Sequence, residues 1–127
     1  MNQIKILLVD DEEDFVKTLS ERLEIRGFVA DIAFNGEKAI KILDDNHYDV
    51  IVLDLRMPGI DGKTVLQHVK KVCPETEVII LSGHGSKKDE KEARLMGAFE
   101  YLQKPVELDR LIHNITNAYE HKTKKNC

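Results

Sequence analysis

Acidic side chains cluster at two places where a short apolar segment of the sequence ends. Asp10 and Asp11 follow the segment Ile4–Val9, and Asp54 follows the segment Val50–Leu53. If the two segments are strands on either side of one cleft, the three carboxylates repel one another by on the order of several kcal/mol. A divalent cation relieves this repulsion, and a site of few carboxylates completed by water favours Mg²⁺. The sequence therefore predicts a Mg²⁺ site.

Two further polar groups follow apolar segments later in the chain. Ser82 follows Val78–Leu81, and Lys104 follows Ala98–Leu102 after one intervening residue. A carboxylate such as Asp54 can act as a nucleophile and become an acyl phosphate. The metal ion and Lys104 would neutralise charge on the transferring oxygens, and the Ser82 hydroxyl would donate to one of them. Together these groups are typical of phosphoryl transfer, with Asp54 as the acceptor.

The polar groups meet only if the segments before them are parallel strands. Apolar runs rich in β-branched residues are typical of strands buried on both faces, and apolar residues three and four apart form one face of a helix. The expected strands are Ile4–Val9, Phe28–Ala33, Val50–Leu53, Val78–Leu81 and Ala98–Leu102. The expected helices are Glu13–Arg26, Glu37–Asp45, Lys63–Val72, Ser86–Met96 and Leu108–Tyr119.

This strict alternation predicts an α/β fold, a doubly wound, flavodoxin-like (βα)5 sandwich around a parallel five-stranded sheet. With strand order 2-1-3-4-5, the first and third strands flank the point where ligands bind in such sheets. Phe28–Ala33 is not purely apolar, since Asp31 interrupts it, so we expect it at an edge. Ser86–Met96 is mostly charged, so we expect a weakly held helix, and low local stability is common in elements that move.

Composition limits the class of protein. The chain has 127 residues, of which 42% are apolar and 33% charged, as in a single globular domain. A net charge of −4 argues against a free-standing nucleic-acid binder. The two cysteines, Cys73 and Cys127, form no disulfide framework and favour a cytoplasmic location. There is no signal-peptide pattern, and no apolar run approaches the ~20 residues of a membrane helix.

Four motifs make residues Ile4 to Tyr119 resemble the receiver domain of two-component response regulators, including the chemotaxis-type receivers. They are LLVDDEE at 7–13, VLDLRMPGIDG at 52–62, IILSGHGS at 79–86 and YLQKP at 101–105. The resemblance implies that Asp54 accepts the phosphoryl group. It also implies that Asp11 binds Mg²⁺ directly, that Asp10 assists, often through water, and that the backbone carbonyl of Arg56 is a further ligand.

The same resemblance assigns the switch. Ser82 matches the hydroxyl residue that moves on activation, Tyr101 the aromatic residue that changes rotamer, and Lys104 the lysine of the site, followed by a cis bond to Pro105. Arg56 and His84 lie where the family tunes the rate of dephosphorylation. The implied donor is a phosphohistidine on a sensor kinase or phosphotransfer protein, and the implied output is a downstream effector domain or protein. No turnover of an external substrate is expected.

Several alternatives stay open. An aspartyl-nucleophile phosphatase usually places a second Asp two residues after the nucleophile, but here that residue is Arg56. A flavin or nucleotide binder would have a Gly- or hydroxyl-rich loop after the first strand in place of DDEED, and a degenerate receiver would serve only as an interaction module. We expect residues 1–120 to form the receiver, either as a single-domain protein or, as we favour, cut from a larger regulator, with the basic segment 121–127 as a frayed end or linker. Homodimerisation through the fourth helix, fifth strand and fifth helix is a further family expectation.

Overall fold

The computed structural model describes residues 3–83 and 85–125. Its parallel strands form one sheet in the order β2-β1-β3-β4-β5, which confirms the predicted topology and places the second strand at an edge. The strands are β1 (Lys5–Val9), β2 (Val29–Ala33), β3 (Val50–Leu53), β4 (Glu77–Ser82) and β5 (Glu100–Gln103). Their bounds differ from the predicted runs by two residues at most, and β4 begins one residue early, on the buried, charged Glu77.

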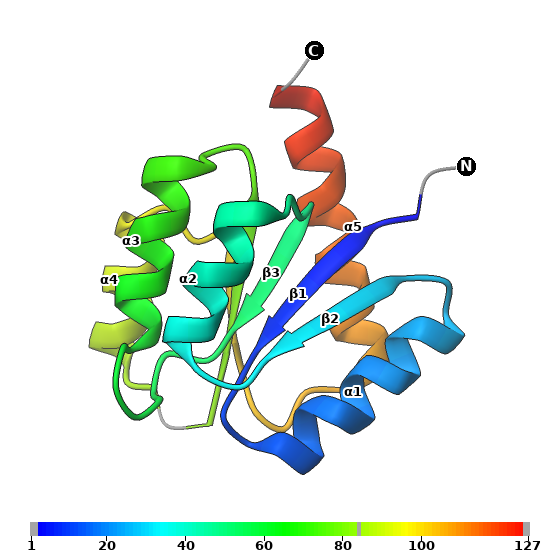
Figure 1. Ribbon diagram of the computed structural model, residues 1–127, viewed down its shortest axis with the longest axis horizontal. Coiled ribbons are helices and arrows are strands. Elements are labelled where there is room, and N and C mark those ends of the chain that lie inside the picture. Colours follow the sequence, from blue (N-terminus) through cyan, green and yellow to red (C-terminus); the bar gives the residue numbers. More distant parts are fainter. Residues whose placement is uncertain (1–2, 84, 126–127) are drawn as a thin grey trace.

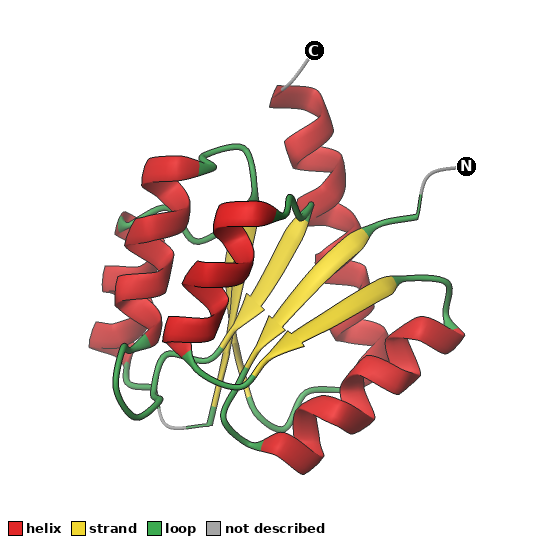
Figure 2. Cartoon of the chain, in the orientation of Figure 1, coloured by secondary structure: helices red, strands yellow, loops and turns green. Residues whose placement is uncertain are grey.

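Helices cover both faces of this sheet (Figures 1 and 2). They are α1 (Glu13–Ile25), α2 (Gly36–Asp45), α3 (Gly62–Val72), α4 (Lys87–Leu95) and α5 (Leu108–Lys125). One apolar core lies under α2, α3 and α4, and a second lies under α1 and α5. Because both faces of the central strands are buried, β3 has a continuous apolar sequence. No helix in the described part of the chain has the length and apolarity needed to cross a bilayer.

Local signals in the sequence set the helix ends. Gly27 follows α1 with a φ of +95°, a backbone conformation that glycine adopts without strain, and its N–H donates to the carbonyl of Glu24. Asn35 and Asp61 accept hydrogen bonds from backbone N–H groups in the first turns of α2 and α3. These caps fix where the loops at the carboxyl ends of the strands give way to helix.

The end of α5 differs from the prediction. We expected the polar segment from residue 121 to be a frayed end or a linker, but the helix continues to Lys125 and extends past the amino-terminal edge of the sheet (Figure 1). His121 pairs with the buried Glu77, and Lys122 Nζ lies 3.0 Å from Asp49 Oδ1. Residues beyond the predicted boundary at 120 therefore contact the body of the domain. Cys127 lies outside the described residues.

Candidate functional site

Two of the predicted carboxylates meet at the carboxyl edge of the sheet. Val9 pairs with Leu53 in the register between β1 and β3, so the residues that follow them, Asp10 and Asp54, lie side by side. Asp10 is 4% exposed and Asp54 5% exposed. The backbone also holds the Asp54 loop, since the Asp54 N–H donates to the Val9 carbonyl at 3.0 Å. The sheet register alone thus brings together two acidic residues that are 44 positions apart.

Lys104 supplies the positive charge of the site. Its Nζ lies 2.7 Å from Asp10 Oδ2, 2.7 Å from Glu12 Oε1 and 3.7 Å from Asp54 Oδ2. The ammonium also lies 4.4 Å from the centre of the Phe15 ring, a favourable cation–π arrangement. In the resting protein Lys104 is therefore bound more closely to the β1–α1 loop than to Asp54.

The charges of the site affect one another's protonation. Burial raises the pKa of Asp10 above its usual range, although the hydrogen bond from Lys104 and that from the Glu12 N–H oppose this rise. For Lys104, burial lowers the pKa, but hydrogen bonds to Asp10 and Glu12 outweigh burial and raise it. Lys104 therefore stays protonated and positively charged. Asp10 is a carboxylate, but its burial favours the protonated form.

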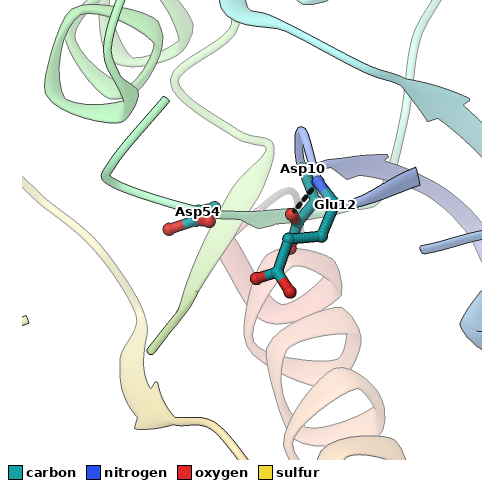
Figure 3. A group of neighbouring side chains, drawn as sticks. All are labelled: Asp10, Glu12 and Asp54. Carbon is teal, nitrogen blue, oxygen red and sulfur yellow. Dashed lines mark hydrogen bonds between the residues drawn. The ribbon is translucent and has the colours of Figure 1, made fainter. Parts of the chain in front are cut away.

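The carboxylates form an oxygen-rich cluster that fits a hard cation. Single carboxylate oxygens of Asp10, Glu12 and Asp54 lie within 4.8 Å of one another, and Figure 3 shows Asp10 and Glu12 beside Asp54. An ammonium already lies among these oxygens, so the geometry suits a cation, and the all-oxygen donor set suits Mg²⁺. Asp11 and Glu12 are both exposed, and in this structure it is Glu12 whose carboxylate lies with those of Asp10 and Asp54.

The loop after Asp54 is packed tightly against the Asp54 carboxylate and backbone. The Arg56 N–H donates to Asp54 Oδ1 at 3.1 Å, which holds the Arg56 backbone beside this carboxylate. Gly62 closes the loop through a hydrogen bond from its N–H to the Leu55 carbonyl at 2.9 Å. A side chain at Gly62 would collide with the backbone of Asp54, so glycine allows the start of α3 to approach Asp54.

The two residues that the resemblance assigns to the switch also lie at this edge. Ser82 ends β4, is fully buried, and accepts the backbone N–H of Lys104 through its own carbonyl at 3.0 Å. Tyr101 on β5 is 7% exposed, and its ring lies against Gly85, where any side chain would overlap the phenol. Burial raises the pKa of Tyr101, and its hydroxyl has no hydrogen-bond partner among residues 3–83 and 85–125.

Two further expectations concern the neighbouring loops. The Lys104–Pro105 bond is cis, as the resemblance implied. His84 lies outside the described residues.

Sequence reasoning missed two acidic residues of this region. Glu12 was named only within the acidic motif after the first strand and was given no role in the site, yet it pairs with Lys104. Asp89 in α4 was not singled out, yet it is buried and bound to Arg56 and Lys63. The spacing of Ser86 and Asp89 matches the S-x-x-D/E pattern of a capping box, and that signal could have marked Asp89.

Sequence comparison supports one family. The model of the response regulator receiver domain matches residues 6–116. An NtrX-like response regulator of Rickettsia conorii is 38% identical over 122 residues, which are 94% of this chain and 26% of that protein. The transcriptional regulatory protein GlrR of Escherichia coli is 37% identical over 115 residues, 91% of this chain and 26% of that protein. The chain thus spans about a quarter of the length of these curated relatives.

Solved structures agree. The receiver domain of the Francisella response regulator 1452 superposes with a TM-score of 0.86 at 34% identity, covering 94% of this chain and 98% of that one. NtrX from Brucella abortus superposes with a TM-score of 0.91 at 31% identity, covering 98% of this chain and 29% of that one. Because the family model matches most of the chain, and these matches share both its sequence and its fold, the chain belongs to the response regulator receiver domain family.

Proposed function

We propose that this domain accepts one phosphoryl group on Asp54 from the phosphohistidine of a cytoplasmic sensor kinase or phosphotransfer protein, and passes the signal to a downstream effector. The observation that supports this most directly is the position of the Asp54 carboxylate. It ends a buried strand beside a second carboxylate, with the Lys104 ammonium 3.7 Å away. A carboxylate in this setting is held as a nucleophile next to a group that stabilises the incoming negative charge.

The transfer follows from the residues of the site. An Asp54 oxygen bonds to phosphorus while the phosphorus–nitrogen bond of phosphohistidine breaks, and the bonding pair stays on the imidazole. Lys104 turns toward the phosphoryl oxygens, and the Ser82 hydroxyl donates to one of them. Mg²⁺, held by Asp10, Asp54 and a third carboxylate from Glu12 or Asp11, together with the Arg56 carbonyl, would supply charge neutralisation.

The switch would follow from the same contacts. Ser82 moves toward the phosphoryl group, and Tyr101 is then held in the inward position, which would change the surface formed by α4, β5 and α5. The relatives that extend well beyond this domain support an effector that reads the surface, and homodimerisation through it is a second route to output. With Arg56 two positions after Asp54, no general acid is available there, so we expect no turnover of phosphate esters.

Mass spectrometry tests the acceptor. Incubation of the protein with acetyl phosphate and Mg²⁺ should add one phosphoryl mass, and Asp54→Asn should remain unlabelled. Asp61→Asn is the matched control, because Asp61 is an exposed cap of α3 a few residues away and should not affect labelling. Labelling of Asp54→Asn to the wild-type level would refute the assignment. Hydrolysis of a chromogenic phosphate ester over many turnovers would instead indicate a phosphatase.

A further inference from the structure

The start of α4 is tied to the loop after Asp54 by a network of charges. Asp89 Oδ2 accepts from Arg56 Nη2 at 3.0 Å, and Asp89 Oδ1 accepts from Lys63 Nζ at 3.0 Å. Lys63 also binds Glu92, one turn further along α4, at 2.6 Å. Two cations from the β3–α3 region therefore bridge to two acidic residues on one face of α4.

Asp89 is the centre of this network. Its side chain is only 10% exposed, and Oδ2 also accepts the N–H of Ser86, which completes a capping box at the start of α4. The Ser86 N–H, Lys63 and Arg56 together hold the pKa of Asp89 well below its usual range. The Asp89 carboxylate is thus ionised and nearly buried, and both of its oxygens accept hydrogen bonds.

Little else holds α4 in place. Asp89 and Ala93 are its only buried residues among Lys87–Leu95, and Leu95 is 78% exposed. A helix with so small an apolar contact depends on its polar contacts for position. The ion pairs with Arg56 and Lys63 are therefore the main contacts that can locate its first turns against α3.

Arg56 connects this network to the acceptor. Its backbone N–H donates to Asp54 Oδ1, while its guanidinium binds Asp89, so one residue touches both. Arg56, Lys63 and Asp89 line one open cavity of about 460 Å³ beside the acceptor loop. The Arg56 side chain is 58% exposed, so it has room to turn away from α4.

We infer that Asp89 is an ion-pair latch that holds α4 in its resting position, and that a phosphoryl group on Asp54 opens the latch by competing for Arg56 and Lys63. A phosphoryl group carries about −1.5 to −2 charge and three acceptor oxygens, and arginine binds such groups with two parallel hydrogen bonds. Once Arg56 turns toward the phosphoryl group, Asp89 loses a partner and the first turns of α4 loosen. The opening step rests on the proposed function, whereas the latch itself exists without phosphorylation.

Hydrogen exchange tests the latch in the unphosphorylated full chain. Asp89→Asn keeps an oxygen to accept the Ser86 N–H but removes the charge. Exchange of α4 amides should become faster by about two- to fivefold, the range expected for ion pairs with one exposed partner. Glu90→Gln is the matched control, because Glu90 lies next to Asp89 but pairs with Arg94, so its α4 exchange should stay near wild type.

A second variant approaches the latch from the other side. Arg56→Met should also accelerate α4 exchange, and adding it to Asp89→Asn should give less than the product of the two effects, because both changes break one pair. Unchanged α4 exchange in both single variants would overturn the latch. If Asp89→Asn fails to fold, the exchange of α4 in Arg56→Met alone tests the latch, and unchanged exchange overturns it.

The competition step has its own measurement. Phosphorylation of wild type should accelerate α4 exchange, and phosphorylation of Asp89→Asn should add little. If the phosphoryl group adds its full effect to Asp89→Asn, the latch is structural only and the proposed competition is wrong. Failure of the proposed function would look different, because wild type would then gain no phosphoryl mass, while the exchange difference between unphosphorylated variants would persist.

Discussion

Helices α4 and α5 pack on opposite faces of the sheet, but different interactions hold them in place (Figure 1). The α5 helix buries Leu111, Ile115 and Ala118 in the core, each at most 1% exposed. The α4 helix buries one alanine and one aspartate and is bound through ion pairs. Apolar packing is insensitive to nearby charge, whereas ion pairs respond to it directly. Under the proposed function, α4 is therefore the helix that we expect a new charge on Asp54 to move.

The largest expected effect comes from the apolar side of this comparison. Ile115→Ala removes a fully buried side chain from the core under α5 and should destabilise the whole domain by about 2–5 kcal/mol. Urea unfolding followed by circular dichroism measures this loss. Ile25→Ala is the control, since Ile25 is 84% exposed and its truncation should change little. If the two variants lost similar stability, packing under α5 would not be what fixes that helix.

A smaller effect is expected at the other end of α5. Glu77 is 2% exposed and pairs with Lys70 and with His121 on α5, so Glu77→Gln leaves partners without their carboxylate. We expect a loss of about 1–3 kcal/mol, the range for a buried hydrogen-bonded group that loses its partner. Thermal unfolding compares this variant with Glu120→Gln, an exposed change on the same helix. Equal melting temperatures would show that the Glu77–His121 pair adds no stability beyond the apolar packing of α5.

The sequence predicted the order of elements because burial on both faces makes each central strand a continuous apolar run. It also predicted Asp10, Asp54, Ser82 and Lys104, since parallel strands bring the residues after their carboxyl ends to one edge. It did not predict Glu77 as part of a strand, because its charge is balanced by Lys70 and by the distant His121. Pairings between residues far apart in sequence leave no periodic pattern.

The choice between neighbouring acidic residues was also beyond the sequence. Asp11 and Glu12 are adjacent and similar, and only the path of the β1–α1 loop relative to Lys104 brings the exposed Glu12 carboxylate to the Lys104 ammonium. The low anchoring of α4 was anticipated from its few apolar residues, and the structure agrees. Its capping box and its bond to Arg56 were not anticipated, although the first has a recognisable spacing.

The cap of α4 gives a smaller and more local prediction. Ser86 accepts the N–H of Asp89 at 3.1 Å, so Ser86→Ala should cost about 1 kcal/mol, mostly as fraying of α4. Amide exchange of α4 and α5 should separate, with only α4 accelerated. Lys87→Ala, an exposed change at the first residue of the helix, should leave both unchanged. An equal acceleration of α5 would mean that the two helices unfold as one unit and that the comparison fails.

The smallest expected effect is a response of α4 to acid. The folded-state pKa of Asp89 is lowered below its ordinary value of 3.8, because the Ser86 N–H, Lys63 and Arg56 all favour the carboxylate. The stability that Asp89 contributes is therefore fully present above that ordinary value and is lost as the pH falls through the lowered folded-state pKa. Backbone chemical shifts recorded from about pH 6 to about pH 3 should show α4 beginning to lose helix before α5.

Asp89→Asn separates this response from general acid unfolding. In that variant α4 should be frayed already at neutral pH and should change little more in acid, since the titrating group is gone. Asp10 responds to acid in the opposite sense. Burial raises its folded-state pKa, so protonation of Asp10 removes a cost of folding and stabilises the folded state. Acid should thus weaken α4 while it relaxes the cleft at β1 and β3. Loss of helical shifts in α4 and α5 at one common pH would show that charge does not hold α4 separately from the rest of the domain.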